Sequence, residues 1–422
     1  MKKRITITEA ASECFLRLGY AETSLEEIVA ESGVVKQTIY NYFSNKDDLF
    51  KAAIEHLLHA TRSEFDSNWY QLPPEKFFAT LAEHQLRTLA QKRTTDFLRL
   101  LVKECRRYPE LQHIYAESIP MPFVNFVAGY IERKQAYSGE IDAHALAWCF
   151  RAALTGYATL LNLGALVAAP LPSPVRFIQV LSFLFAKFLE LEKNRSSELE
   201  TKERKFFGIE EFLVSAEAPL ASKRLSILVA AVKVFSEKGY AESSMDEVAL
   251  RASVSKQTVY KHFGNKNQLY ISLADSLIAK LQDSTLPDQS LSMLEYIQQL
   301  AGLLSEQSEE PWLREYFRCV FGESQVFPLP SGRLLLYLMH FGHAGLGAKI
   351  KETYKLSDSE SEPLILILRC IIGAFVLFSQ IYVLGDNPYL NQKSLLKIIY
   401  ALLESFEKVR PDYPPDTGIQ LK

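Results

Sequence analysis

The 422-residue chain lacks the features that define several protein classes. Its five cysteines are an odd number and none forms a C-x-x-C pair, so neither a disulfide framework nor a zinc site is indicated. Strand-like alternation of apolar and polar residues is scarce, whereas apolar residues spaced i, i+3, i+4 recur in nearly every segment. The expected fold class is therefore all-α.

Long apolar runs are also missing. Residues 152–175 carry no charge but are diluted by Gly, Pro, Thr and Asn, and residues 370–384 are too short for a membrane span of ~20 residues. Both runs are expected to be helices buried inside the protein. The basic N-terminus is not followed by the apolar core of a secretion signal. We expect a cytoplasmic protein with no membrane partner.

Signatures of catalysis are absent as well. The chain has no Gly-rich phosphate loop, no G-x-S-x-G and no H-E-x-x-H, so we expect no enzyme, no metal and no cofactor. The net charge of −3 argues against a protein that coats nucleic acid by bulk charge. Locally the balance differs: residues 1–60 hold seven Lys/Arg against nine Asp/Glu, and residues 221–280 hold nine against five. The second segment is the more basic one.

What the chain does contain is a long internal repeat. Residues 15–50 and 235–270 align without a gap, and counting identical positions gives 16 of 36. The longest shared stretch is KQTIYNYF at 36–43 and KQTVYKHF at 256–263. A repeat of this length indicates a repeated architecture. Whatever the segment does, the protein does twice.

Each copy has the pattern of a helix-turn-helix. Residues 5–18 place apolar side chains on one helical face, and Gly19 is expected to end that helix in a left-handed conformation. The pattern S-x-x-E at 24–27, repeated at 244–247, is a capping box that begins a short second helix. A four-residue turn then leads to the Lys-Gln-Thr helix. Two short helices joined by such a turn, after a longer helix, form a helix-turn-helix.

In this geometry the first residues of the last helix face base edges in the major groove. Lys, Gln and Thr side chains can all form hydrogen bonds with bases. The candidate base contacts are Lys36, Gln37, Thr38 and Asn41, and in the second copy Lys256, Gln257, Thr258 and Lys261. A solvated helix start is the alternative. Because the copies differ at Asn41/Lys261 and at the next position, we expect an imperfect palindrome with half-sites about one helical turn apart.

The shared residues resemble the N-terminal DNA-binding domain of the tetracycline-repressor (TetR/AcrR) family of bacterial regulators. The resemblance rests on Gly-Tyr at 19–20, Ser24, the YNYF block and Asn-Lys at 45–46, and on the same positions 220 residues later, where the block reads YKHF. It implies a three-helix DNA-binding head, a larger helical body for ligand binding and dimerisation, and a repressor that leaves DNA when a small molecule binds. The phosphate contacts that it implies are Ser24, Tyr40, Tyr42 and Lys46, and Ser244, Tyr260, His262 and Lys266.

Simpler roles stay open for some of these residues. Tyr40 and Tyr260 could pack within the heads, and Lys46 and Lys266 could be ordinary surface lysines.

Two differences between the copies argue against equal DNA affinity of the heads. Val35 stands where the second copy has Ser255, so the first recognition helix loses a good N-cap, at a cost of ~1 kcal/mol. Ser253 stands where the first copy has Gly33, so a residue with a Cβ must adopt any left-handed conformation that the turn requires.

The repeat extends beyond the heads. Further helices are expected at 46–68, from 73 to about 92, and at 96–108, 141–167, 174–193, 362–385 and 391–409, the last aligning with 174–193 at an offset of 218. In the family, the last two helices form a four-helix dimer interface. We therefore predict an intramolecular pseudo-dimer, with pairing of two chains as the alternative. The expected domains are head 1 (1–47), body 1 (48–195), a linker (196–220), head 2 (221–267) and body 2 (268–422).

The predicted partners are a double-stranded DNA operator and an unknown, largely apolar small-molecule effector. Aromatic side chains of the bodies are candidates for a ligand pocket, with ordinary core packing as the alternative: Tyr108, Tyr115, Phe123, Trp148, Tyr157, Trp312, Phe317, Tyr337 and Phe375. A rival hypothesis is an all-helical scaffold or small-molecule binding protein whose heads no longer bind DNA. The acidic first head and Val35 favour it.

Overall fold

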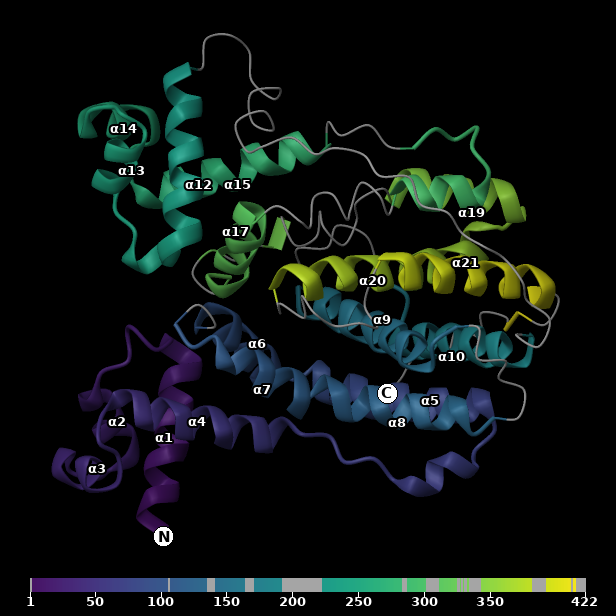
Figure 1. Ribbon diagram of the computed structural model, residues 1–422, viewed down its shortest axis with the longest axis horizontal. Coiled ribbons are helices and arrows are strands. Elements are labelled where there is room, and N and C mark those ends of the chain that lie inside the picture. The colour runs from purple at the N-terminus through teal and green to yellow at the C-terminus, as the bar shows by residue number, and fades with distance from the viewer. Residues whose placement is uncertain are drawn as a thin grey trace.

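The computed structural model describes most of the chain, and the described part is helical without strands (Figure 1). The described residues are 2–104, 107–134, 141–163, 171–191, 222–282, 287–300, 311–324, 327, 329, 332–333, 343–381, 392–410 and 413–414. The expected linker at 196–220 and the candidate Tyr337 lie outside them, as do the side chains of Trp312 and Phe375.

Two three-helix heads lie at one end of the molecule (Figure 1). Head 1 comprises α1 (Lys2–Leu18), α2 (Leu25–Ser32) and α3 (Lys36–Tyr42). Head 2 comprises α12 (Ser222–Glu242), α13 (Met245–Arg251) and α14 (Lys256–Phe263). The expected helix stop is confirmed, because Gly19 has φ +83° and its amide donates to the carbonyl of Phe15 at 2.9 Å.

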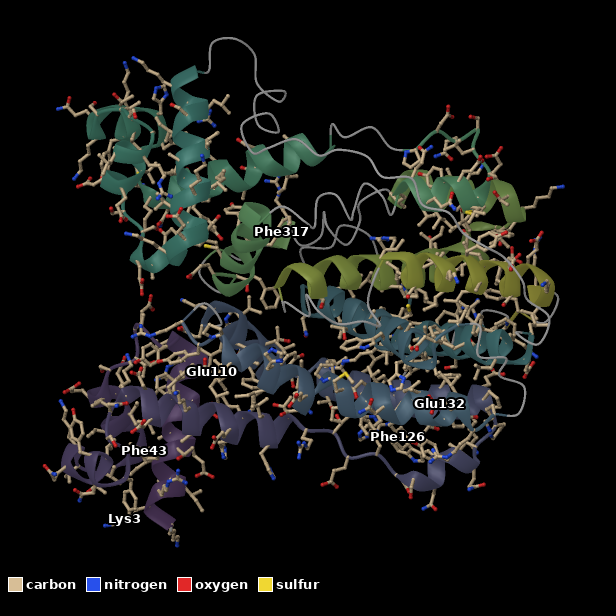
Figure 2. The ribbon with its side chains drawn as sticks, viewed as in Figure 1. Lys3, Phe43, Glu110, Phe126, Glu132 and Phe317 are labelled. Carbon is tan, nitrogen blue, oxygen red and sulfur yellow. The ribbon has the colours of Figure 1, made fainter. Side chains whose placement is uncertain are left out.

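Body 1 begins with a helix that packs against α1 of its own head, α4 (Lys46–Thr61). A short 3-10 turn, Ser67–Gln71, precedes the others: α5 (Pro74–Leu89), α6 (Lys92–Glu104), α7 (Glu110–Ser118), α8 (Pro120–Glu132), α9 (Ala143–Leu163) and α10 (Pro174–Leu191). Phenylalanine and tyrosine rings fill the space between α5 and α8, where Phe77 stacks on Tyr130 with ring centroids 3.5 Å apart, close to the labelled Phe126 of Figure 2.

Body 2 contains α15 (Lys266–Gln282), α17 (Pro311–Gly322), α19 (His343–Tyr354), α20 (Asp358–Ile381) and α21 (Gln392–Val409). Helix α20 begins four residues earlier than the sequence predicted and tolerates Pro363 in its interior. Its start is capped because the amide and hydroxyl of Ser357 both donate to the Glu360 carboxylate. That cap lies before the apolar run on which the prediction was based.

Four long helices join the two bodies. Helix α9 packs along α20 and α10 packs on α21, and each of α9 and α10 also contacts the other helix of the second pair (Figure 1). These are the expected helices 141–167, 174–193, 362–385 and 391–409, within the limits of the described residues. No helix in the described ranges is long and apolar enough to cross a membrane.

Two further boundaries differ from the expected ones. The connecting helix α4 ends at Thr61 rather than near residue 68, and Arg62 there takes an extended conformation. The helix predicted at 96–108 begins four residues earlier, at Lys92, and is described as far as Glu104. Charged residues at the start of α6 have no apolar periodicity, which is why the pattern missed its first turn.

Candidate nucleic-acid interface

The second helix of each head begins with the same side-chain cap. The Ser24 hydroxyl accepts from the amide of Glu27 at 3.2 Å, and the Glu27 carboxylate accepts from the Ser24 amide at 2.6 Å. Ser244 and Glu247 repeat this capping box in head 2. In each head the two amides joined by the box are thereby satisfied, which fixes the residue at which the second helix begins. As phosphate contacts, Ser24 and Ser244 remain predictions.

The recognition helices α3 and α14 attach to their heads through one face. Ile39 and Phe43 are buried in head 1, and Val259 and Phe263 are buried in head 2. The opposite face is open, and Tyr40 and Tyr260 are 46% and 42% exposed. These two tyrosines therefore do not serve as core residues of the heads, and they remain available for the predicted phosphate contacts.

The predicted difference in helix capping is present. Val35 (φ −76°, ψ 149°) and Ser255 (φ −72°, ψ 149°) have nearly the same backbone conformation. The Ser255 hydroxyl accepts from the amide of Thr258 at 3.2 Å, whereas Val35 supplies no side-chain cap. The recognition helix of head 1 consequently begins without the stabilising contact that its counterpart has.

The turn between the two short helices also differs as predicted. Gly33 ends α2 with φ +67°. Ser253 occupies the equivalent position with φ +54°, which makes it one of the non-glycine residues with positive φ in the described chain. A Cβ in this region is strained, so the turn of head 2 is formed at a conformational cost that head 1 avoids.

The first lysine of each recognition helix is paired with a carboxylate of the preceding helix. Lys36 Nζ lies 2.6 Å from Glu26 Oε1, and Lys256 Nζ lies 2.7 Å from Asp246 Oδ1. The hydrogen bond to its carboxylate raises the pKa of each lysine. All four side chains are about half exposed or more, so these pairs are weak and can exchange. To reach a base, either lysine must first leave its carboxylate.

The lysines at the start of the next helix point inward. Lys266 Nζ donates to the carbonyls of Tyr240 at 2.7 Å, Ser243 at 2.9 Å and Ala241 at 3.3 Å, which uses all three of its donors. Lys46 Nζ lies 4.3 Å from the centre of the Tyr20 ring. Burial lowers the pKa of both lysines. Their observed contacts close the turn after the first helix, and a phosphate contact by either would require a new rotamer.

The remaining candidates lie on or near the exposed face. Gln37 Nε2 donates to Asn41 Oδ1 at 3.4 Å along α3, and Tyr42 is 41% exposed. At the end of α14, Lys261 and His262 replace Asn41 and Tyr42, so head 2 presents more potential positive charge to a phosphate backbone.

The sequence did not single out the contacts that fix head 1 on its body. The hydroxyls of Tyr20 and Tyr108 both donate to Asp47 Oδ1, and the amide of Tyr20 donates to the Glu104 carboxylate at 3.1 Å. The hydrogen bond from Tyr108 is the main reason that the pKa of Asp47 is lowered. The Arg107 guanidinium covers the Tyr20 ring at 4.4 Å. These contacts connect the first turn of the head with the end of α6.

The predicted ligand-pocket residues that the structure describes are packed in the core. Tyr157 stacks on Phe177 and its hydroxyl donates to the carbonyl of Pro172 at 2.6 Å. The others are equally buried: Tyr108, Tyr115, Phe123, Trp148 and Phe317. None of them lines either of two sizeable cavities in the described part of the chain, a cleft of about 390 Å³ and a groove of about 510 Å³ beside α5 and α10.

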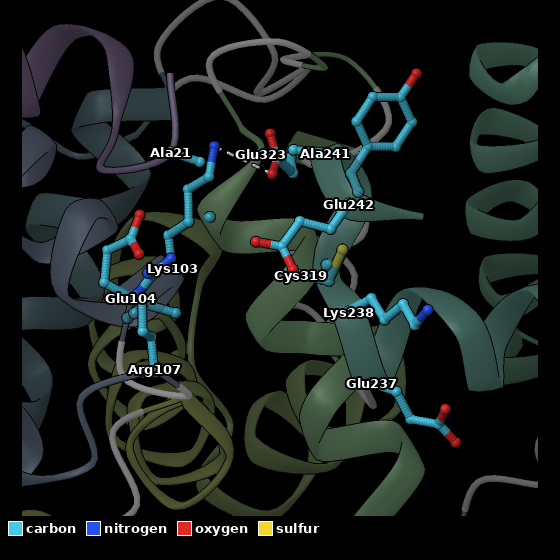
Figure 3. Close-up of a pocket in the computed structure, with 14 residues that line it drawn as sticks. Ala21, Lys103, Glu104, Arg107, Glu237, Lys238, Ala241, Glu242, Cys319 and Glu323 are labelled. Atoms are coloured by element: carbon cyan, nitrogen blue, oxygen red, sulfur yellow. Dashed lines mark ion pairs between the residues drawn. The ribbon is translucent and has the colours of Figure 1, made fainter. Parts of the chain in front are cut away.

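The cleft of about 390 Å³ lies between the two halves, behind the heads (Figure 3). Its walls come from the end of α6 on one side and from α12 and α17 on the other. Lys103 Nζ crosses it to Glu323 Oε1 at 3.2 Å, and the Glu104 side chain lies on the wall of the first half. Burial raises the pKa of Glu104. The cleft is polar and charged, unlike the apolar pocket that the sequence predicted.

The geometry defines a class: a chain with two three-helix heads, each of which contains a helix-turn-helix. Comparison with known proteins agrees, because the family described as "Bacterial regulatory proteins, tetR family" matches residues 7–53 and again residues 227–273. The chain thus contains two TetR-type N-terminal domains in tandem.

Individual relatives match over short segments. The "HTH-type transcriptional activator FasR" of Mycolicibacterium smegmatis is 37% identical over 70 residues, which is 16% of this chain and 32% of that protein. The "HTH-type transcriptional repressor Rv3405c" of Mycobacterium tuberculosis is 41% identical over 56 residues, or 13% and 30% of the two chains. The chain thus spans about a third of the length of these curated relatives.

A longer alignment joins the chain to the "Uncharacterized HTH-type transcriptional regulator YhgD" of Bacillus subtilis, with 25% identity over 30% of this chain and 64% of that protein. A solved structure of a putative TetR-family regulator from Mesorhizobium loti aligns with a TM-score of 0.32 and 21% identity, covering 44% of this chain and 95% of that one.

Proposed function

We propose that the protein is a sequence-specific, DNA-binding regulator of transcription in the cytoplasm, and that it acts as a repressor. One observation carries this proposal: each of two TetR-type heads exposes the same Lys-Gln-Thr helix start, and both heads lie at one end of the molecule. The relatives named as an HTH-type activator and a repressor support a role in transcription.

The arrangement of the bodies supports an intramolecular pseudo-dimer. Helices α9 and α10 pack on α20 and α21, which are the equivalent helices of the second repeat. A single chain would then present two heads to two half-sites of one operator. Because Asn41 and Tyr42 are replaced by Lys261 and His262, the operator would be an imperfect palindrome.

The effector is proposed to be a small molecule that favours a head spacing that the operator cannot accept. The two described cavities provide possible volumes for such a molecule, one charged and one mostly lined by aliphatic side chains. An apolar effector fits the groove beside α5 and α10 better than the cleft behind the heads.

A rival function is an all-helical binding protein whose heads do not engage DNA. The ion pairs of Lys36 with Glu26 and of Lys256 with Asp246 favour it, since both candidate base contacts are already occupied and a carboxylate close to the DNA repels phosphate. Their exposure makes the pairs exchangeable, so they weigh less than the duplicated exposed helix face.

In vitro selection from random duplex DNA tests the proposal. We expect one near-palindrome with two half-sites, and an affinity that falls steeply with salt. Replacing Lys36 and Gln37 by alanine should lower the affinity for this DNA about 10- to 100-fold and relax base preference in one half-site. The same replacement of Lys256 and Gln257 should relax base preference in the other half-site. The exposed Lys51→Ala, on α4, serves as control. Enrichment of no sequence at low salt would support the rival function.

A further inference from the structure

The two halves of the chain differ at the point where they meet behind the heads. Helices α6 and α17 pack against each other across the boundary. Their sequences align at an offset of 219, and three pairs of positions are then identical: Arg99 and Arg318, Glu104 and Glu323, and Pro109 and Pro328. In this alignment Lys103 of the first half corresponds to Gly322 of the second.

These equivalent positions face each other. A Cβ added to Gly322 would lie 3.2 Å from the Cβ of Lys103 and 3.4 Å from its Cα. Gly322 is not among the glycines with positive φ, so space rather than backbone conformation explains the absence of a side chain. Lys103 extends past it to the buried carboxylate of Glu323 (Figure 3). A large cationic residue in one half therefore fits beside the smallest residue in the other.

A second mismatch of this kind lies where α9 crosses α20. A Cβ added to Gly156 would lie 2.8 Å from the Cα, the Cβ and the carbonyl oxygen of Cys370, closer than such atoms can approach. At the offset of 218 that aligns Arg151 with Arg369, Gly156 corresponds to Ala374 and Cys370 corresponds to Ala152. The close approach thus needs glycine in the first half, and the second half has alanine there.

We infer that the two halves are built to pair with each other and not with copies of themselves. Two first halves would oppose Lys103 with Lys103, where like charges meet in a partly buried contact. Two second halves would bring the Cβ of Ala374 against the backbone of Cys370. Neither conflict arises when a first half packs against a second half, so each half fits the other half of the chain better than a copy of itself. The inference rests on the proposed pseudo-dimer.

Exchange of the two residues between the halves tests this inference on the full chain. Lys103→Gly leaves the buried Glu323 without its cation, and Gly322→Lys places two lysines together, so each single variant should lower the melting temperature by roughly 5 °C or more. In the double variant the exchanged ammonium should pair with Glu104, which corresponds to Glu323 in the alignment, and most of the loss should be recovered.

A matched control separates this coupling from the cost of glycine in a helix. Lys92→Gly makes the same change at the exposed start of α6, where Lys92 pairs with Asp96 of its own helix. It should combine additively with Gly322→Lys. If the exchanged double variant loses the full sum of its single losses, the inference is wrong. Unchanged melting of both single variants would overturn it equally.

A second pair of variants covers the case in which the lysine variants fail to fold. Gly156→Ala should lower the melting temperature. Ala374→Gly, at the corresponding position of the second half, should change it by no more than an ordinary helix glycine. Equal effects of the two would contradict the inference. No DNA is present in these measurements, so their outcome is separable from the failure of the proposed DNA binding.

Discussion

The missing cap on the recognition helix of head 1 makes a quantitative prediction. Val35 and Ser255 share their backbone conformation, and the amide of residue 38 already lies in the position that the amide of Thr258 occupies in head 2. A serine hydroxyl at position 35 can therefore accept from the Thr38 amide without movement of the chain. Because Val35 is 67% exposed, little buried apolar area is lost in the exchange.

The expected gain from Val35→Ser is ~1 kcal/mol in the stability of the start of α3. This corresponds to about fivefold slower hydrogen exchange of the amides that are protected only by local opening of that helix. The reciprocal change, Ser255→Val, should accelerate exchange in the first turn of α14 by a similar factor. Amide exchange followed by mass spectrometry or NMR measures both heads of the same molecule.

The reciprocal design provides the control, since α14 should not respond to Val35→Ser nor α3 to Ser255→Val. If exchange at Thr38 is unchanged by the added hydroxyl, then the cap does not form and the difference between the heads has another origin. If Ser255→Val has no effect either, the hydrogen bond of 3.2 Å between Ser255 and Thr258 contributes nothing to the helix start.

Three further predictions concern charged residues. Glu26→Gln and Asp246→Asn should each release a lysine, tighten DNA binding several-fold and steepen its dependence on salt, as titrations at several salt concentrations would reveal. Lys266→Met should destabilise its head by ~1–3 kcal/mol, and Lys46→Met should destabilise the other head by less, because only Lys266 donates to three carbonyls. Chemical unfolding of the two variants compares the losses, and equal losses would contradict this explanation. Burial raises the pKa of Glu104 above its ordinary 4.5. Between pH 4.5 and the raised pKa, the folded chain therefore holds a proton that the unfolded chain has released. The free energy of unfolding consequently falls as the pH rises through this range. Glu104→Gln should flatten that fall in melting temperature, and an unchanged pH profile would refute the assignment.

Local sequence determined much of the heads. The helix stop at Gly19, the capping boxes at Ser24 and Ser244, and the left-handed turn at Ser253 depend on residues a few positions apart, and all of them are present as predicted. The internal repeat likewise determined that there are two heads, because a pattern repeated at a fixed offset does not depend on how distant segments pack. Helix boundaries failed where caps or charged turns lay outside the apolar pattern, as at α6 and α20.

Tertiary structure alone decided which side chains are free to act. Lys46 and Lys266 stand at positions that resemble phosphate contacts, but their ammonium groups lie over a tyrosine ring or among carbonyls of a turn some twenty residues earlier in the chain. The Lys103–Glu323 pair joins residues more than two hundred positions apart. No local pattern predicts this pair, because it forms only when α6 packs on α17. Its free energy depends on how far that packing removes the two charges from water.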